Sequence, residues 1–195
     1  MKNILSCDWG TSAFRLRIVN VDDKKVLDEI ISDNGMNAIH NEWIATRKDE
    51  SERLNFYRNF IQSNIDKMRA NVVQGLPVII SGMASSSIGM KELSYAKTPF
   101  GLSGDDLITE SFIADEFCTH DILLVSGLQT TNDVMRGEET LLLGCEVKDE
   151  ALAIFPGTHS KHVAIENNIV ADIKTYMTGE FFELLSTKSL LAKSV

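Results

Sequence analysis

The segment Asp8-Trp9-Gly10-Thr11-Ser12 has the residue types of a phosphate-binding turn. Glycine permits a tight backbone whose N–H groups point outward, and such concavities bind anions. Thr11 and Ser12 add hydroxyl donors, and Asp8 is suited to hold Mg²⁺ directly or through water. A simple hairpin in which Asp8 caps the turn explains the same residues, because Asp and Gly are common in turns. Taken alone, this segment leaves both interpretations open.

A second turn of similar composition, Gly157-Thr158-His159-Ser160-Lys161, favours the phosphate interpretation. It also joins two predicted strands, and Lys161 adds a point charge suited to phosphate. We expect the two turns to face each other across a cleft and to hold one polyphosphate between them. His159 and His162 have no third ligand at a metal-binding spacing, so we predict no zinc site here.

Asp133 lies in a polar segment ahead of a predicted helix. One interpretation is structural: Thr131 or Asn132 caps the helix, and Asp133 stabilises the positive end of its dipole. The other is a general base that orients a substrate hydroxyl for phosphoryl transfer. The residues alone favour the cap. Arg136 and Glu138 are either a solvated helix face or a polar cluster that faces a substrate.

The Ser- and Gly-rich segment 81–104 follows a predicted buried strand at 77–80. In open α/β sheets, ligands bind beyond the carboxyl ends of the strands. Small hydroxyl side chains there, such as Ser85, suit a polyhydroxylated ligand. A flexible surface loop is the alternative interpretation.

The elements that must position these residues follow from hydrophobic periodicity. Strands at 4–7, 14–21 and 26–31 form an antiparallel meander, and a second meander follows at 152–155, 163–165 and 169–175. Between and after them we expect helices at 51–68, 108–118, 134–147 and 179–191, with strands at 77–80 and 122–125. The order predicts an α/β fold in which parallel strands extend an antiparallel meander and helices cover both faces.

Composition excludes several classes of protein. The 195 residues carry a net charge of −9, which disfavours a nucleic-acid partner. No apolar run reaches membrane-spanning length, and the N-terminus lacks a signal-peptide core. Three widely spaced cysteines form neither a disulfide framework nor a metal motif, so we interpret them as buried, reduced thiols in a cytoplasmic protein. A second meander with one helix is a poor core, which favours self-association into a homo-oligomer.

These motifs together resemble a known family. Asp8 to Arg15 resembles the first phosphate motif of the actin, chaperone and sugar-kinase superfamily. Three more specific segments are similar to the 2-dehydro-3-deoxygalactonokinase family: 133–140 (DVMRGEET), 155–161 (FPGTHSK) and 175–180 (TYMTGE).

The resemblance implies a ribonuclease-H-like, actin-like fold, with a first domain at 1–148 and the opening of a similar second domain at 149–195. It implies ATP-dependent, Mg²⁺-dependent phosphorylation of the 6-hydroxyl of 2-dehydro-3-deoxy-D-galactonate or a related sugar acid. The implied catalytic residues are Asp133 as the base and Asp8 at the metal. The implied phosphate contacts are Gly10, Thr11, Ser12, Gly157, Thr158, Ser160 and Lys161, and the implied sugar contacts are Gly82, Met83, Ser85, Arg136 and Glu138.

Two departures from the family pattern keep other functions open. Family members carry Arg, Gln and Trp where this pocket loop has Ser87, Ile88 and Met90, so an arginine that could bind the substrate carboxylate is missing. Family chains also continue past this length, through an adenosine-binding region. A non-catalytic module that binds a sugar acid or phosphate is therefore the alternative, and an ATPase of the chaperone or actin type is a third.

Overall fold

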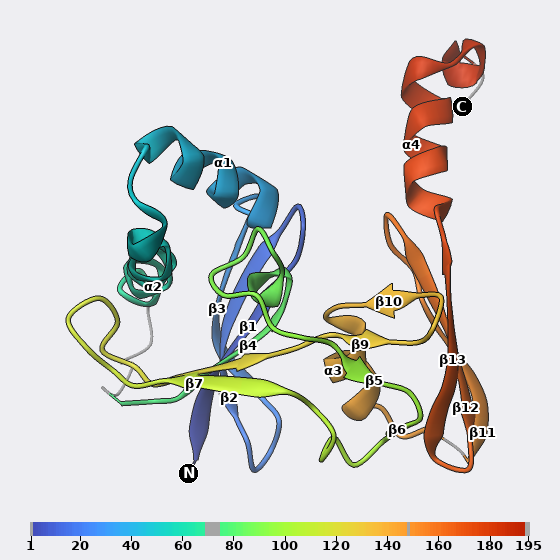
Figure 1. Cartoon of the computed structure of the whole chain (residues 1–195), viewed down its shortest axis with the longest axis horizontal. Coiled ribbons are helices and arrows are strands. Elements are labelled where there is room, and N and C mark those ends of the chain that lie inside the picture. The colour runs from blue at the N-terminus through green and yellow to red at the C-terminus, as the bar shows by residue number, and fades with distance from the viewer. Residues whose placement is uncertain (1, 69–74, 148, 194–195) are drawn as a thin grey trace. The chain divides into compact units, whose positions relative to one another are not determined.

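The computed structural model describes residues 2–68, 75–147 and 149–193 (Figure 1). The chain divides into two compact units. The first contains Met1–Ser94 and Ile108–Gly127, and the second contains Tyr95–Leu107 and Leu128–Val195. This division groups residues by compactness and differs from the domains expected at 1–148 and 149–195, which stay a prediction. Each unit is described by itself.

The first unit is built on a six-stranded sheet in the order β3-β2-β1-β4-β8-β7. Its meander is β1 (Asn3–Trp9), β2 (Phe14–Asn20) and β3 (Val26–Ser32). Strand β4 (Val78–Gly82) pairs parallel to β1, and β8 (Ile122–Val125) pairs parallel to β4. Strand β7 (Thr109–Phe112) closes the other edge antiparallel to β8. The structure therefore has the predicted meander extended by parallel strands.

Strict alternation of apolar residues gives this sheet one buried face. Leu5, Cys7 and Trp9 are at most 1% exposed, while the residues between them are only half-buried. Helices α1 (Met36–Thr46) and α2 (Arg53–Ile65), the second preceded by a 3₁₀ turn at Glu50–Glu52, contribute side chains to the same core. Both described helices of the unit thus contribute to one core, which differs from the expected cover on both faces.

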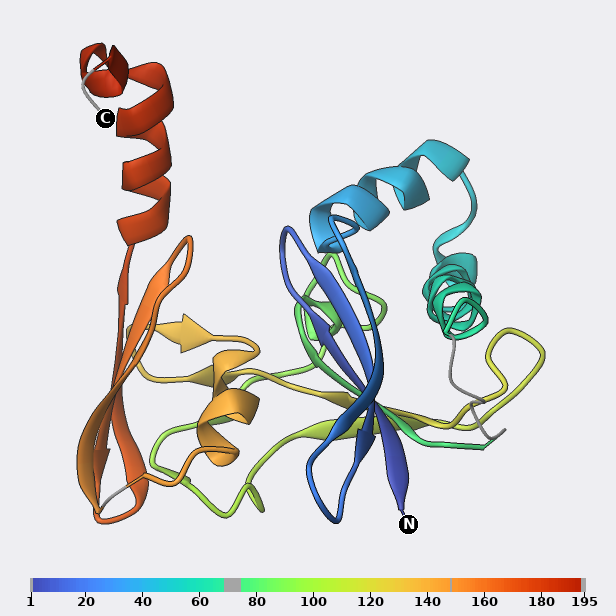
Figure 2. The ribbon, with the colours of Figure 1, turned by 180° about the vertical axis from the view of Figure 1, so that it is seen from behind.

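The second unit contains a four-stranded sheet in the order β11-β12-β13-β6. Its meander is β11 (Glu150–Phe155), β12 (Ser160–Glu166) and β13 (Ile169–Tyr176), and β6 (Phe100–Gly101) pairs with β13. A small sheet of β5 (Ala96–Lys97), β9 (Leu128–Gln129) and β10 (Val134–Met135) adjoins α3 (Glu138–Leu143). Helix α4 (Thr178–Lys188) and a 3₁₀ turn at Leu190–Lys193 follow, and Figure 2 shows them extending beyond the meander.

Two predicted helices differ from the structure, and one observed helix was not expected. The helix expected at 108–118 is wrong: residues 109–112 form strand β7, and Asp115 then accepts the N–H groups of Phe117 and Cys118 in a turn. The helix expected from residue 134 begins only at Glu138, because β10 pairs with β9 and Gly137 has a φ of 110°. Helix α1 was not predicted.

The cysteines agree only in part with the expectation of buried thiols. Cys7 and Cys118 are buried, and burial raises the pKa of both thiols, that of Cys7 to well above its usual value. Cys145 is exposed, because α3 ends before it. None of the three is in a disulfide.

Candidate functional site

The first predicted phosphate turn connects β1 to β2 and presents its hydroxyl residues to solvent. The N–H of Gly10 donates to the carbonyl of Ala13 at 2.9 Å, which closes the turn. Thr11 and Ser12 at its tip are exposed. Asp8, on the last part of β1, forms an ion pair in which Arg15 Nη1 lies 2.9 Å from its Oδ2. The aspartate thus pairs across the hairpin and does not cap the turn through any described hydrogen bond.

Helix α1 supports this turn from behind. The N–H of Met36 donates to the carbonyl of Gly10 at 2.9 Å, and that of Asn37 donates to the carbonyl of Thr11 at 3.2 Å. These are two of the N–H groups that a helix N-terminus leaves without an intrahelical partner. A Cβ on Gly35 would lie 2.3 Å from the carbonyl carbon of Ser12, so this close approach requires glycine. Gly35 was not among the predicted residues, although a glycine directly before a helix is a recognisable pattern.

The pocket loop, residues 82–90, contains three of the predicted sugar contacts. It begins at the end of β4, beside the first turn. Residues Asp8 and Trp9 pair with Ser81 and Gly82 in parallel register. Gly82 has a φ of 93°, and a Cβ there would lie 2.6 Å from the carbonyl oxygen of Trp9. Two segments far apart in sequence therefore meet at the carboxyl ends of neighbouring parallel strands.

Helix α2 fixes this pocket loop. Arg53 Nε donates to the carbonyl of Gly89 at 2.8 Å, and the Tyr57 hydroxyl donates to that of Ile88 at 2.7 Å. Burial raises the pKa of Tyr57 to about 12, so the hydroxyl remains a donor at ordinary pH. Ser85 is fully buried, and its hydroxyl donates to the carbonyl of Gly82. These contacts argue against a flexible surface loop.

The second predicted phosphate turn, between β11 and β12, has the same support as the first. The N–H of Glu180, in α4, donates to the carbonyl of Thr158 at 3.0 Å. A Cβ on Gly179 would lie 2.5 Å from the carbonyl oxygen of Gly157. His159 Nε2 also lies 2.6 Å from a carboxylate oxygen of Glu180. The motif at 175–180 is therefore the segment that packs against the turn.

Asp133 accepts three hydrogen bonds and lies ahead of strand β10, not at the start of a helix. Its Oδ1 accepts from the N–H of Val134 at 2.7 Å and from the Thr175 hydroxyl at 2.6 Å, and its Oδ2 accepts from the N–H of Thr175 at 2.6 Å. Partial burial opposes the charged form, but these hydrogen bonds and nearby Lys161 outweigh it and lower the pKa of Asp133. The helix-cap interpretation is thus wrong, and the carboxylate is ionised at neutral pH.

The segment between Asp133 and α3 carries a second, different carboxyl group. Glu139 is fully buried, and both its carboxylate oxygens accept from the N–H of Gly137, at 2.9 and 2.7 Å. Burial raises the pKa of Glu139 to about 8, against the effect of those hydrogen bonds. Glu138 accepts from the N–H of Arg136, whose guanidinium lies 4.2 Å from the centre of the Tyr95 ring. Residue type alone did not distinguish Glu139 from its neighbour.

The structure brings the predicted residues together in two sets, one in each unit. The first unit contains Asp8, Gly10, Thr11, Ser12, Gly82, Met83 and Ser85. The second contains Asp133, Arg136, Glu138, Gly157, Thr158, Ser160 and Lys161. Ser160 and Lys161 are buried at the start of β12 and do not point from the tip of the turn.

The described residues contain neither a preformed cluster of metal ligands nor a helix that could span a membrane. Among them, no three His, Cys, Asp or Glu side chains lie close enough together to hold a metal ion. A magnesium ion that keeps several waters and binds substrate phosphates needs only one or two carboxylates. The absence of a three-residue cluster is therefore compatible with the predicted role of Asp8. In the same part of the chain, no helix combines the length and apolar character needed to cross a membrane.

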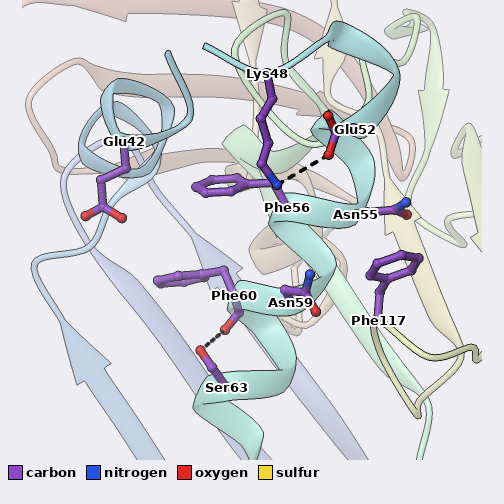
Figure 3. Close-up of a pocket in the computed structure, with 9 residues that line it drawn as sticks. All are labelled: Glu42, Lys48, Glu52, Asn55, Phe56, Asn59, Phe60, Ser63 and Phe117. Atoms are coloured by element: carbon purple, nitrogen blue, oxygen red, sulfur yellow. Dashed lines mark hydrogen bonds and ion pairs between the residues drawn. The ribbon is translucent and has the colours of Figure 1, made fainter. Parts of the chain in front are cut away.

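A pocket of about 320 Å³ lies elsewhere on the first unit, over α2 (Figure 3). Phe56, Phe60 and Phe117 are among its lining residues, and Lys48 pairs with Glu52 at its rim. None of the predicted site residues lines it. It is therefore distinct from both predicted sets.

Comparison with known proteins identifies the family. A family model described as 2-keto-3-deoxy-galactonokinase matches residues 8–195. A Rhizobium meliloti protein named as a 2-dehydro-3-deoxygalactonokinase is 34% identical over 96% of this chain and 58% of its own length. An Escherichia coli 2-dehydro-3-deoxygalactonokinase is 35% identical over 59% of this chain and 39% of its own length.

A solved structure agrees with these matches. A Sinorhizobium meliloti protein assigned as a 2-dehydro-3-deoxygalactonokinase superimposes with a TM-score of 0.72 and 31% sequence identity, covering 98% of this chain and 60% of that one. The chain thus spans less than two thirds of the length of these relatives. Because the family model matches nearly the whole sequence, the chain belongs to the 2-keto-3-deoxy-galactonokinase family.

Proposed function

We propose that this chain is the phosphate- and sugar-acid-binding part of an ATP-dependent sugar kinase. Its substrate would be the 6-hydroxyl of 2-dehydro-3-deoxy-D-galactonate or a related 2-keto-3-deoxy sugar acid. The names of the relatives support the reaction class. The reduced cysteines and the acidic net charge are in keeping with a cytoplasmic enzyme of small molecules.

The observation that carries this proposal is that the fold leaves room for a Cβ at Gly10 and at Gly157. Neither glycine has a positive φ, and a Cβ would meet nothing closer than 3.5 Å at Gly10 or 4.0 Å at Gly157. The fold therefore requires glycine at neither position, whereas a phosphate that approaches the backbone closely would. Exposed Thr11, Ser12 and Thr158 supply hydroxyl donors beside these glycines.

The repeated support of the two turns favours a pair of related domains. Each turn joins the first two strands of a meander, and the helix after the third strand donates an N–H group to it. Gly35 and Gly179 occupy matching positions against the two turns. We propose on this basis a ribonuclease-H-like, actin-like domain at 1–148 and the opening meander and helix of a similar second domain at 149–195.

Asp133 has the properties of the base in this reaction. It would take the proton of the substrate hydroxyl as that oxygen forms a bond to the γ-phosphorus, while the bond to the leaving ADP oxygen breaks. A carboxylate offers about four acceptor positions, and the described contacts use three, which leaves one for the hydroxyl. Mg²⁺, held by Asp8, would neutralise charge on the phosphates.

We keep as proposed sugar contacts the five residues that the family resemblance implies. Gly82, Met83 and Ser85 lie at the start of the pocket loop, Glu138 is the first residue of α3, and Arg136 comes two residues before it. Ser87 replaces the family's arginine, so Arg136 is the remaining cation among the proposed sugar contacts. We therefore assign it to the substrate carboxylate.

One observation favours a second candidate function. Ser87, Ile88 and Met90 stand where the family has Arg, Gln and Trp, so a module that binds the sugar acid or phosphate without transferring a phosphoryl group is the alternative. Both candidates predict binding, and only the kinase predicts turnover.

The test is a coupled ADP-release assay with Mg-ATP and a panel of sugar acids, together with calorimetric binding. Asp133→Asn is expected to lower the rate by roughly 10²–10⁴-fold and to leave nucleotide affinity unchanged. Asp172→Asn, which alters an exposed carboxylate on β13, is the matched control and should keep the full rate. Sugar-acid binding without ADP release would support the alternative module, and ADP release without sugar acid would support a chaperone- or actin-type ATPase.

A further inference from the structure

The ammonium group of Lys161 is directed into the second unit and away from solvent. The residue is 9% exposed. Its Nζ donates to the carbonyl of Val134 at 2.7 Å and to the hydroxyl oxygen of Thr175 at 2.7 Å. The β12–β13 register places Lys161 directly opposite Thr175. Two of its three ammonium protons are therefore engaged by groups beside Asp133.

The hydrogen bonds around Thr175 can run in only one direction. An ammonium group has no acceptor, so the Thr175 hydroxyl must accept from Lys161. Its single proton is then left for Asp133 Oδ1, 2.6 Å away, while the N–H of Thr175 donates to Oδ2 at 2.6 Å. The result is an ordered chain from the ammonium through the hydroxyl to the carboxylate.

This series of hydrogen bonds fixes the position and the charge of the Asp133 carboxylate. Thr175 contacts both oxygens, so the carboxylate plane cannot rotate without breaking a hydrogen bond. The bond from Lys161 to Val134 attaches the residue next to Asp133 to the same group. Lys161 is also the charged group that acts on Asp133 among the described residues. A hydroxyl that accepts from a cation becomes a stronger donor.

Resting on the proposed role of Asp133 as the base, we propose that Lys161 and Thr175 are positioning residues: Lys161 acts through the Thr175 hydroxyl to hold the Asp133 carboxylate oriented and ionised. Lys161 is thereby assigned a role other than the phosphate contact implied by the family resemblance. The two roles are distinguishable, because a phosphate contact would affect anion binding and a positioning residue would affect the proton affinity of Asp133.

The experiment is a ¹³C NMR titration of the Asp133 carboxyl in the whole chain. Thr175→Val removes the hydroxyl and keeps the shape and the backbone N–H, so the pKa of Asp133 should rise by roughly one unit. Lys161→Met should raise it in the same direction by a smaller amount. Thr175→Ser, which restores the hydroxyl, and Lys174→Met, an exposed lysine on the same strand, should leave it within about 0.3 units of the wild-type value.

Two results would overturn the proposal. One is an unchanged pKa of Asp133 in both Thr175→Val and Lys161→Met. The other is a pKa of Asp133 in Lys161→Met that is unchanged from the wild type, together with at least a tenfold loss of tripolyphosphate affinity. That result would assign Lys161 to phosphate. If Lys161→Met fails to fold by circular dichroism, Thr175→Val decides the outcome alone. Failure of the proposed function gives a different result, in which the titration shifts as expected but no ADP is released.

Discussion

Two carboxyl groups six residues apart have opposite electrostatic environments. Asp133 has its pKa lowered by three hydrogen bonds and Lys161, while Glu139 has its pKa raised to about 8 by burial. Both are acidic residues in one family motif, and the sequence identified Asp133 from that motif alone. Their partners include Thr175 on β13 for Asp133 and the N–H of Gly137, directly before α3, for Glu139, which residue type does not reveal.

Glu139 should make the stability of the protein depend on pH. Its pKa is raised from 4.5 to about 8, so its contribution is fully present below pH 4.5 and is lost as the pH rises through 8. Glu139→Gln keeps the hydrogen bond from Gly137 without the charge. We expect this variant to be more stable than the wild type at pH 9, by at least about 1 kcal/mol, and no more stable at pH 4.5.

Thermal melts from pH 4.5 to 9 measure this difference. Glu146→Gln is the control, because its side chain is exposed, and its profile should follow that of the wild type. Parallel melting profiles for Glu139→Gln and the wild type would contradict an energetically costly charge at residue 139.

At the scale of elements, the glycines at the two predicted phosphate turns fall into two classes. A Cβ on Gly35 or Gly179 would overlap backbone atoms at 2.3 to 2.5 Å. The nearest atom to a Cβ would lie 3.5 Å away at Gly10 and 4.0 Å away at Gly157, so both positions have room for one. We expect Gly35→Ala and Gly179→Ala to destabilise the chain by roughly 1–3 kcal/mol through overpacking. Gly10→Ala and Gly157→Ala should cost less than about 1 kcal/mol.

Urea denaturation combined with tripolyphosphate titration separates the two classes. Gly10→Ala and Gly157→Ala should weaken anion binding at least severalfold while their unfolding midpoints stay near that of the wild type. If they instead lose as much stability as Gly35→Ala, the fold itself requires glycine at both positions, and a phosphate-binding role is no longer needed to explain them.

Strand patterns made most of the fold predictable. Both meanders, β4 and β8 were expected from alternating or continuous apolar runs, and all are present. The segment 108–118 was predicted as a helix because its edge-strand pairing with β8 is a long-range contact that local periodicity does not contain. Helix α3 was expected too early for a similar reason, since residues 134–135 pair with β9. The turns were predictable from their residue types, but the packing of Gly35 and Gly179 was not.

At the scale of the whole molecule, the second unit leaves apolar side chains in solvent. On α4, Phe181 is 57% exposed and Phe182 is 65% exposed, and none of its described residues is buried. Leu152 and Ile154 are exposed on β11, on the face of the sheet opposite its core. Exposed apolar surface of this kind promotes association.

We therefore expect the 195-residue chain to self-associate at micromolar concentration. Phe181→Ser combined with Phe182→Ser should shift the population toward monomer and lower the binding of a hydrophobic dye at least twofold. The free energy of unfolding should change by less than about 0.5 kcal/mol per substitution, because both rings are exposed. Light scattering coupled to size-exclusion chromatography is the measurement, and a wild-type chain that is monomeric at all concentrations would contradict the expectation.

The contact between each turn and the helix behind it also has a consequence for how the chain folds. Met36 reaches back to Gly10, and Glu180 reaches back to Thr158, across one meander in each case. Closing such short loops costs little entropy, and contacts between residues close in sequence form quickly. Each turn and its supporting helix can therefore assemble from their own stretch of chain, early and without waiting for the other turn. A nascent polypeptide could complete the first turn and its supporting helix while the second is still being synthesised.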